Sequence, residues 1–353
     1  MRVLLRVVLG LVAVALAGAS FLALVETDAW WVRMTDFPRL QYAVALAALL
    51  ALLAAARPAG RGLRIGLAAL ALAALGYNLT KIGPYLWGAR SETAAVCAPD
   101  RRLTVMVANV RLENRHAEPL LAMVRARNPD LLLALETNAW WDARLSPLTQ
   151  EMPHVVSEIT GGHFGMHLFS TLPLEHAEAL FPVGQDAPAI RATVRLPSGE
   201  AVRFLGLHPR PPHPGQSARG RDAQLMWAAL QAREAEAPAV LAGDLNAVPW
   251  ERSMERAQRI GALLDPRDAL GFKPTYDATS WWMRWPLDQV LHQSGARTVA
   301  FTVLPGFGSD HYPVLAELCL DEAERTPSRL EDDDLEEAQR TIEAARNQAG
   351  GRG

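Results

Sequence analysis

The segment FGSDHYPVLAEL, residues 307–318, places a serine, an acid and a histidine directly before an alternating apolar run. The alternation from Val314 to Leu318 predicts a β-strand, so Asp310 and His311 lie on the loop that enters it. Glycine, serine and aspartate in succession are also ordinary turn residues. Taken alone, the pair therefore fits either a turn or a catalytic site.

Polar residues of the same kinds end other strand-like runs of the chain. They are Asn109 in 103–110, Glu136 in 130–136, His208 in 189–208, Asp244 and Asn246 in 239–246, and Asp288 in 286–293. A single polar strand end carries no information, because every strand must end. With Asp310 and His311 there are six such places carrying only Asn, Asp, Glu and His, and this set indicates a shared site.

Such a set suits metal-assisted hydrolysis of a phosphoester. Hard carboxylate and amide oxygens bind Mg²⁺ and leave water in its coordination shell. A carboxylate can deprotonate the attacking water, and histidine or asparagine can donate hydrogen bonds to the phosphate as negative charge develops.

The elements that must position these residues are mostly short strands. Residues 189–208 predict a hairpin about a Pro-Ser-Gly turn, and the buried runs 130–136 and 239–246 are typical of central strands. Helices are predicted at 117–124, ended by Asn128-Pro129, and at 218–236. Many strands with few helices favour a layered α/β sandwich with the helices outside.

The motifs VMVANV, LLLALET, LGLHP, LAGDLNAVP, PLDQVL and GSDHYPV, in this order, resemble the endonuclease/exonuclease/phosphatase superfamily. This superfamily includes pancreatic-type deoxyribonuclease, apurinic endonucleases, neutral sphingomyelinases and inositol polyphosphate 5-phosphatases. The resemblance implies a four-layered α/β sandwich of two packed mixed sheets, here a catalytic domain over 101–320, with the strand ends meeting at one edge.

The resemblance also implies a role for each residue. Glu136 resembles the metal-binding glutamate, with Asn109 beside it as a further metal ligand or substrate contact, and the metal would be Mg²⁺ or Mn²⁺. Asp244 resembles the aspartate that activates or orients water, and Asn246 the asparagine that holds phosphate. The remaining residues are His208, which would assist the phosphate or leaving group, Asp288 of the penultimate motif, His311, which would stabilise the transition state, and Asp310, which would orient the His311 ring or help bind metal.

Two departures from the family pattern leave the substrate open. Ala108 stands where a tryptophan or tyrosine often precedes the asparagine, and the histidine motif reads LHPRPPHPG rather than Thr-His-Leu. Residues outside the motifs are interpreted structurally. We expect loop or surface positions for His163, His167 and His213, and packing roles for Trp140-Trp141 and Trp281-Trp282 with Trp285, with an apolar substrate wall as the alternative. For Arg210, Arg219 and Arg221, phosphate contact and ordinary surface remain equal alternatives.

The first 90 residues predict a membrane region. Apolar stretches cover 3–25, 40–56 and 65–79; the first two approach the length of a bilayer span, and the third is the shortest. A signal peptide is the alternative for the first stretch alone. The cations Arg2, Arg6, Arg57, Arg61 and Arg64 place the N-terminus and second loop in the cytoplasm. Three spans would then place the rest outside it, which in a bacterium is the periplasmic side of the inner membrane.

Two further features concern the ends of the catalytic domain. Cys97 and Cys319 lie at its two ends and could form a disulfide where disulfides persist, or remain two unrelated thiols. Residues 321–353, rich in acids and alanine, predict a solvated helix or disorder.

These observations predict a membrane-tethered, divalent-metal-dependent hydrolase of phosphoesters: a phosphodiesterase, nuclease or phospholipid head-group hydrolase. The net charge of −3 does not support binding of nucleic acid through bulk positive charge, and the tether favours lipid slightly. The alternative from another class is a non-catalytic sandwich that binds a phosphorylated ligand at the membrane surface.

Overall fold

The computed structural model describes residues 2–56, 60–87, 97–320 and 327–351. The chain divides into two compact units, one formed by Met1–Gly88 with Pro212–Ala218 and the other by Ala89–Pro211 with Arg219–Gly353. Each unit is described by itself below. Arg57, one of the cations used to predict orientation, lies outside the described residues.

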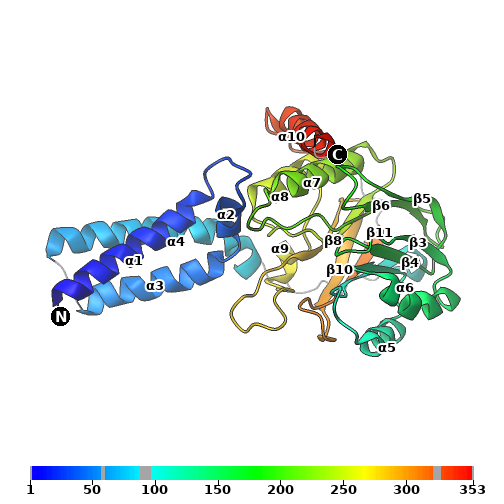
Figure 1. Cartoon of the computed structure of the whole chain (residues 1–353), viewed down its shortest axis with the longest axis horizontal. Coiled ribbons are helices and arrows are strands. Elements are labelled where there is room, and N and C mark those ends of the chain that lie inside the picture. The colour runs from blue at the N-terminus through cyan, green and yellow to red at the C-terminus, as the bar shows by residue number, and fades with distance from the viewer. Residues whose placement is uncertain (1, 57–59, 88–96, 321–326, 352–353) are drawn as a thin grey trace. The chain divides into compact units, whose positions relative to one another are not determined.

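The first unit is a bundle of long helices (Figure 1). Its elements are α1 (Arg2–Leu22), α2 (Trp30–Arg33), η1 (Met34–Asp36), α3 (Arg39–Ala56) and α4 (Arg61–Trp87). The three long helices share one apolar cluster, in which alanines such as Ala13, Ala71 and Ala74 are buried beside leucines. Small side chains at a helix contact allow the backbones to approach closely.

Two helices of this unit, Val3–Leu22 and Arg61–Trp87, are long and apolar enough to cross a membrane. A third span results only if Trp30–Asp36 and Arg39–Ala55, which are bent by 68°, are counted as one. The third apolar stretch, the shortest in the sequence, therefore lies within a helix of spanning length. The helix over 65–79 continues in both directions and is the longest of the unit, at 27 residues.

A buried polar network joins the helices of the first unit. Arg39 donates to Asp36 Oδ1 at 2.9 and 2.6 Å and to Asn78 Oδ1 at 3.1 Å, and Asn78 Nδ2 donates to Ser20 Oγ at 2.8 Å. Because a buried charge needs a partner, this network ties α1, α3 and α4 together.

The second unit contains two mixed sheets. The first sheet has the order β10-β11-β1-β2-β4-β3 and the second has the order β5-β6-β7-β8-β9. Only β1–β2 and β7–β8 pair in parallel; the other neighbours are antiparallel. The strands are β1 (Arg102–Asn109), β2 (Leu131–Leu135), β3 (His154–Glu158), β4 (Met166–Ser170), β5 (Leu174–Leu180), β6 (Ala189–Arg195), β7 (Ala201–Leu207), β8 (Ala239–Asp244), β9 (Asp288–His292), β10 (Ala296–Val303) and β11 (Val314–Leu320).

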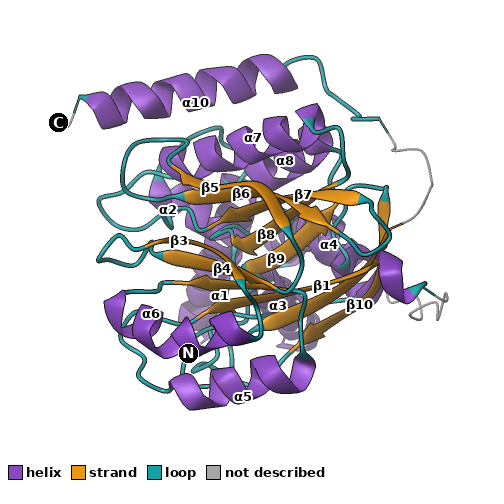
Figure 2. Ribbon diagram, turned by 90° about the vertical axis from the view of Figure 1, so that its right-hand side faces the viewer, coloured by secondary structure: helices purple, strands orange, loops and turns teal. Residues whose placement is uncertain are grey.

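The helices cover the outer faces of the two sheets, so that the unit has four layers (Figure 2). The helical elements are η2 (Pro99–Arg101), α5 (Ala117–Arg127), α6 (Ala139–Leu145), η3 (Ser146–Gln150), α7 (Arg219–Glu234), α8 (Arg252–Gly261), α9 (Arg267–Leu270) and α10 (Asp334–Gly350). Strand alternation sorts the side chains between layers. On β1, Val105 and Val107 face the core between the sheets, whereas Met106 and Ala108 pack under α5 and α6. The predicted four-layered sandwich of two mixed sheets is confirmed.

Three strands of this unit were not predicted from the sequence. The strands predicted around the motif residues are present, but β3, β4 and β5 are additional. The β5 segment, LEHAEAL, contains the charged residues Glu175 and Glu178. Its pairing with β6 shifts register between these two residues. Its partly exposed pattern does not alternate, and alternation is the main signal of a strand.

The acidic tail ends in a packed helix rather than in a solvated one. Helix α10 buries Ala338, Ile342 and Ala345 in the same apolar cluster as α7 and α8. Its first residue, Asp334, is fully buried and accepts hydrogen bonds from Arg259 at 2.7 and 2.9 Å and from Arg256 at 3.1 Å. Residues 321–326 of the predicted tail lie outside the described residues.

We expect the Asp334→Asn variant to lose roughly 2 kcal/mol of unfolding free energy at pH 7, because it weakens charge-assisted hydrogen bonds. Burial raises the pKa of Asp334, but hydrogen bonds from Arg259, the Glu331 backbone and Arg256 outweigh it and leave that pKa at about 2. A lowered carboxylate pKa stabilises the fold above its usual value of 3.8 and ceases to do so as the pH falls through about 2.

The difference between variant and wild type should therefore shrink between pH 4 and pH 2, the interval bounded by these pKa values. Denaturant unfolding followed by tryptophan fluorescence at several pH values measures it. The Asp333→Asn variant, at a neighbouring exposed carboxylate, is the control. A loss that is the same at pH 7 and pH 2 would contradict the assignment.

The two cysteines form a disulfide. Cys97 and Cys319 are bonded across a sequence separation of 222 residues, and this joins the start of the second unit to β11. Of the two alternatives left open by the sequence, the structure has the bridge.

Candidate active site

The six polar strand ends meet at one edge of the two sheets. In the first sheet, β1 and β2 run parallel and end at Asn109 and before Glu136, and β11 begins at the same edge because it is antiparallel to β1. In the second sheet, β7 and β8 run parallel toward His208 and Asp244, and the antiparallel β9 begins with Asp288 opposite Asp244. Strand direction thus brings together residues that are far apart in sequence.

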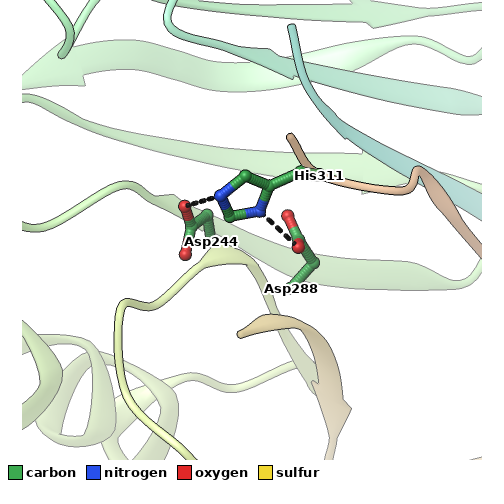
Figure 3. A group of neighbouring side chains, drawn as sticks. All are labelled: Asp244, Asp288 and His311. Atoms are coloured by element: carbon green, nitrogen blue, oxygen red, sulfur yellow. Dashed lines mark hydrogen bonds and ion pairs between the residues drawn. The ribbon is translucent and has the colours of Figure 1, made fainter. Parts of the chain in front are cut away.

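His311 lies between two carboxylates at the centre of this edge (Figure 3). Its Nδ1 donates to Asp288 Oδ2 at 2.8 Å, and its Nε2 lies 3.6 Å from Asp244 Oδ2. The expectation that Asp310 orients this ring is therefore wrong, because Asp288 makes that contact. The His311 backbone is held by Ser309, whose hydroxyl accepts from the His311 N–H at 3.1 Å and donates to the Asn109 carbonyl at 2.8 Å.

The Asp244 carboxylate is held by hydrogen-bond donors on both of its oxygens. Its Oδ1 accepts from the backbone N–H of Asn246 at 3.0 Å, and its Oδ2 accepts from Asn109 Nδ2 at 3.1 Å. His208 Nε2 lies 3.6 Å from the same Oδ2 atom, as His311 does on its other side. The carboxylate is thus flanked by two imidazoles and one amide.

Asn109 donates to Glu136 as well, at 3.0 Å from Nδ2 to Oε1. Its Oδ1 accepts from the backbone N–H of Arg111 at 2.9 Å, and since a backbone N–H can only donate, the orientation of the amide is fixed. In this orientation Asn109 offers nitrogen, not oxygen, to the two carboxylates. The geometry favours a role in positioning Glu136 and Asp244 over the expected role of metal ligand.

The other predicted residues also lie at this edge. Asn246 has a left-handed backbone (φ 49°), and its Nδ2 donates to the Pro209 carbonyl at 3.0 Å beside His208. Asp310 is partly buried, with Oδ1 3.5 Å from Ser309 Oγ, and its negative charge raises the pKa of both His311 and Tyr276.

The ionisation of the site follows from these contacts. Burial lowers the pKa of His311, but the charges of Asp288 and Asp244 raise it to about 10, so the ring is protonated at neutral pH. Burial raises the pKa of Asp244, with a further increase from Asp288, against the opposing charges of His311 and His208. Burial also raises the pKa of Glu136, but nearby His208 and the hydrogen bonds from Leu112, Asn109 and His163 outweigh it, and the pKa falls below its usual value.

The residues fit a divalent cation by their chemistry. Two polar atoms of the site, His208 Nδ1 and Asp288 Oδ1, are buried without a hydrogen-bond partner among the described residues. A buried polar atom without a partner is costly, and such a site accepts a further polar group. Carboxylate oxygens, the ligands that Mg²⁺ and Mn²⁺ prefer, are concentrated here. Asp244, Asp288 and His311 have ligand atoms within 4.8 Å of one another and could hold such an ion.

Sequence reasoning missed some neighbours of the site. His163, predicted to be an ordinary surface histidine, is exposed but its Nδ1 lies 3.1 Å from Glu136 Oε2. Phe164 packs against His208 at 5.5 Å between ring centroids, and Tyr276 packs against His311 at 4.8 Å. The one sequence signal for the first two was the glycine-rich stretch before β4. No local signal indicated Tyr276, which lies outside the motifs.

Other expectations are corrected in part. His213 is exposed, as predicted, but His167 is buried on β4, between Thr137 and Asp142. Arg221 is neither on the surface nor free for phosphate, since it is buried and donates to Glu251, Asp222 and the Asn246 carbonyl. Trp141 is in the core as expected, whereas Trp281 is 88% exposed and Trp282 51% exposed, so packing does not explain this second pair.

The fold is a four-layered α/β sandwich with a cluster of Asp, Glu, Asn and His side chains at one edge of its two sheets. A family model described as the Endonuclease/Exonuclease/phosphatase family matches residues 106–311, and the chain therefore belongs to this family. A search of curated protein sequences finds no match.

Solved structures with the same fold are distant in sequence. The endonuclease/exonuclease/phosphatase from Beutenbergia cavernae DSM 12333 is 23% identical over 67% of this chain and 76% of that one, with a TM-score of 0.53. D. rerio TDP2, complexed with a single-strand DNA product, is 17% identical over 62% and 98%, with a TM-score of 0.54. The human Nocturnin catalytic domain, with bound sulfate, is 16% identical over 64% and 97%, with a TM-score of 0.51.

Proposed function

We propose that the chain is a divalent-cation-dependent hydrolase of phosphoester bonds, held at a membrane by its N-terminal helices. The observation that carries the proposal is the convergence of His208, Asp244, Asp288 and His311 with Asn109 and Glu136 at one edge of the sandwich. Family membership supports the class of reaction.

Each of these residues is assigned a separate role in hydrolysis. Asp244, held in place by the Asn246 N–H and Asn109, orients a water molecule and accepts its proton as the water oxygen attacks phosphorus. The protonated His311, oriented by Asp288, donates to a phosphoryl oxygen where negative charge builds. His208, on the other side of Asp244, donates to the phosphate or to the departing oxygen as the phosphorus–oxygen bond breaks.

Glu136 is the residue we assign to the cation, with Asp310 as the second candidate. In the Asp244, Asp288 and His311 group, both ring nitrogens already face carboxylates and the ring carries a proton, so a cation there would have to displace that proton. Glu136 has a lowered pKa, and 16% of its side chain is exposed. A divalent cation bound there supplies electrostatic stabilisation of the phosphate charge.

The substrate class is proposed in two alternatives, a nucleic acid or a phospholipid head group. D. rerio TDP2, with the same fold, is described with a single-strand DNA product, which supports testing DNA first. The apolar helices support a membrane location for the enzyme, and a periplasmic catalytic domain requires the third span, which forms if the bent pair Trp30–Asp36 and Arg39–Ala55 crosses as one. The Cys97–Cys319 disulfide supports an oxidising compartment, and hence the periplasmic side for the catalytic domain.

The experiment assays the full chain in detergent on bis(p-nitrophenyl) phosphate, single-stranded DNA and sphingomyelin, with Mg²⁺ or Mn²⁺ and then with EDTA. We expect EDTA to abolish hydrolysis. Glu136→Gln should raise the cation concentration for half-maximal rate by roughly 100-fold, since even indirect supports of a metal site are worth about 10–100-fold in affinity.

The matched control is Glu118→Gln, at an exposed carboxylate on α5. Hydrolysis that persists in EDTA, or a cation requirement unchanged by Glu136→Gln, would contradict the cation assignment. A folded protein that binds the cation but hydrolyses none of these substrates would instead favour the binding-module alternative.

A further inference from the structure

The backbone of Glu136 is held in an unfavourable conformation. The residue follows the last residue of β2 and has φ 61°, in the left-handed region. For a residue other than glycine this conformation is unfavourable, and it persists only where the surroundings enforce it. The left-handed turn sets the direction of the Glu136 side chain, so whatever enforces the turn also sets the direction of the carboxylate.

The next residue, Thr137, is clamped from two sides. It is fully buried, and its N–H donates to the Gly165 carbonyl at 3.0 Å. A Cβ added at Gly165 would lie 1.9 Å from the Thr137 carbonyl oxygen, so only glycine permits this close approach of the two backbones. The Thr137 hydroxyl lies 2.9 Å from Nδ1 of His167, on the neighbouring strand β4.

His167 connects Thr137 to helix α6. Its ring is buried, and its Nε2 lies 3.0 Å from Asp142 Oδ1. An ionised carboxylate only accepts hydrogen bonds, so Nε2 carries the proton. Burial lowers the pKa of His167 and outweighs the opposing effect of Asp142, so the neutral ring is favoured. In that tautomer Nδ1 accepts from the Thr137 hydroxyl, so Asp142 fixes the ring and the ring fixes Thr137.

The other side of Glu136 is tied to the same helix. Asn138 caps the N-terminus of α6 by accepting from the N–H groups of Trp140 and Trp141 at 3.0 and 3.1 Å. Its Nδ2 donates to the Leu112 carbonyl at 3.4 Å, and the Leu112 N–H donates to Glu136 Oε2 at 3.0 Å. Both the backbone of Glu136 and its carboxylate are therefore connected to α6.

We infer that Thr137, His167 and Asp142 form a buried chain of hydrogen bonds that positions the Glu136 carboxylate for the cation. The inference rests on the proposed role of Glu136 as the cation ligand. The three are positioning residues. The competing interpretation is that they only satisfy buried polar groups, in which case their loss lowers stability without changing cation affinity.

Direct Mn²⁺ binding to the full chain in detergent, without substrate, separates the two interpretations. The free Mn²⁺ signal in electron paramagnetic resonance gives the dissociation constant. We expect Thr137→Val, which removes the hydroxyl at nearly constant volume, to raise this constant about 10-fold. Thr137→Ser keeps a hydroxyl and should restore binding to within about twofold of wild type. In turnover, we expect a higher Mn²⁺ requirement with little change in kcat at saturating Mn²⁺.

The control removes a comparable hydrogen bond at the other end of β1. Thr104 Oγ1 lies 2.7 Å from Asp130 Oδ2, and Thr104→Val deletes that contact far from the strand ends of the site. It should lower thermal stability to a similar degree and leave the Mn²⁺ dissociation constant unchanged. Asp142→Ala, at a side chain 52% exposed on α6, is a second variant that should fold readily and weaken Mn²⁺ binding in the same direction as Thr137→Val.

Equal Mn²⁺ affinity in Thr137→Val and wild type, or equal weakening in Thr104→Val, would overturn the inference. If Glu136→Gln binds Mn²⁺ as wild type does, the cation assignment and this inference both fail. If the chain hydrolyses no phosphoester but Thr137→Val still weakens Mn²⁺ binding, the proposed function fails and the positioning chain stands.

Discussion

Replacing Asp244 with asparagine is expected to lower kcat about 10³-fold, within the range measured for loss of a general base. The asparagine amide cannot accept the proton of the attacking water. It also brings an N–H₂ group toward Asn109 Nδ2, His208 and His311, which all point toward the present carboxylate oxygen. The effect should fall on kcat rather than on KM, because proton acceptance matters in the transition state.

The same variant should also be less stable than the wild type, because its single amide oxygen cannot accept both from the Asn246 N–H and from Asn109 Nδ2. Burial raises the pKa of Asp244, which means that the ionised carboxylate costs stability at neutral pH. A neutral asparagine removes that cost, but it places an N–H₂ group against hydrogen-bond donors and takes a negative charge away from the protonated His311, so activity and stability should both decrease. Steady-state rates with bis(p-nitrophenyl) phosphate and denaturant unfolding of the same preparations measure both.

Asp130→Asn is the matched control for this experiment. Asp130 is a carboxylate that accepts hydrogen bonds from Thr104 at the opposite end of β1 and β2, and its replacement should leave kcat within about twofold of wild type. A tenth or more of the wild-type rate in Asp244→Asn would remove Asp244 from the proposed role of base. Stability equal to or above that of the wild type would count against the hydrogen bonds assigned to the Asp244 carboxylate.

Replacing Arg221 with methionine is expected to lower the free energy of unfolding by about 3–5 kcal/mol, because it leaves a buried carboxylate without its cation. Arg221 is fully buried in α7 and donates to Glu251, which is itself buried. It also donates to the Asn246 carbonyl at 2.8 Å, so the loop that carries Asn246 and follows Asp244 loses a support. A decrease in activity should accompany the loss of stability.

Removal of both charges tests the reason for this expected loss. Arg221→Met with Glu251→Leu should recover most of the stability, since a buried ion pair is often no better than an apolar pair of similar volume. Arg340→Met breaks an exposed ion pair with Glu337 and should cost less than about 1 kcal/mol. If Arg221→Met unfolds within about 1 kcal/mol of wild type, the pair is not the stabilising contact that its burial suggests.

The sequence predicted the site where local pattern and the order of the motifs were sufficient. Asn109, Asp244 and His208 each end an apolar run, and the resemblance of the motifs to the family implied that these strand ends meet at one edge. The contact between Asp288 and His311 could not be predicted in this way. It depends on the register in which β9 pairs with β8 and on the path of the loop before β11, and neither is recorded in local residue order.

The buried polar residues away from the motifs were mispredicted for a related reason. A histidine or an arginine is usually exposed, and apart from Asp222 beside Arg221 nothing adjacent in sequence indicates the partners of His167 and Arg221. Two distant partners, Asp142 in α6 and Glu251 directly before α8, reach their places only when these helices pack against the sheets in the complete fold. The packed α10 was missed because its apolar residues, spaced among acids, make a face only when α7 and α8 are present to receive it.

The disulfide between Cys97 and Cys319 determines how the molecule responds to cutting and pulling. It closes a covalent ring across 222 residues, and the chain enters and leaves the ring at the same place. A protease that cuts once between these cysteines would leave both fragments attached to the N-terminal helices. A pulling force applied between those helices and the chain after Cys319 would be transmitted through the disulfide. The two sheets that hold the site would therefore not bear that force.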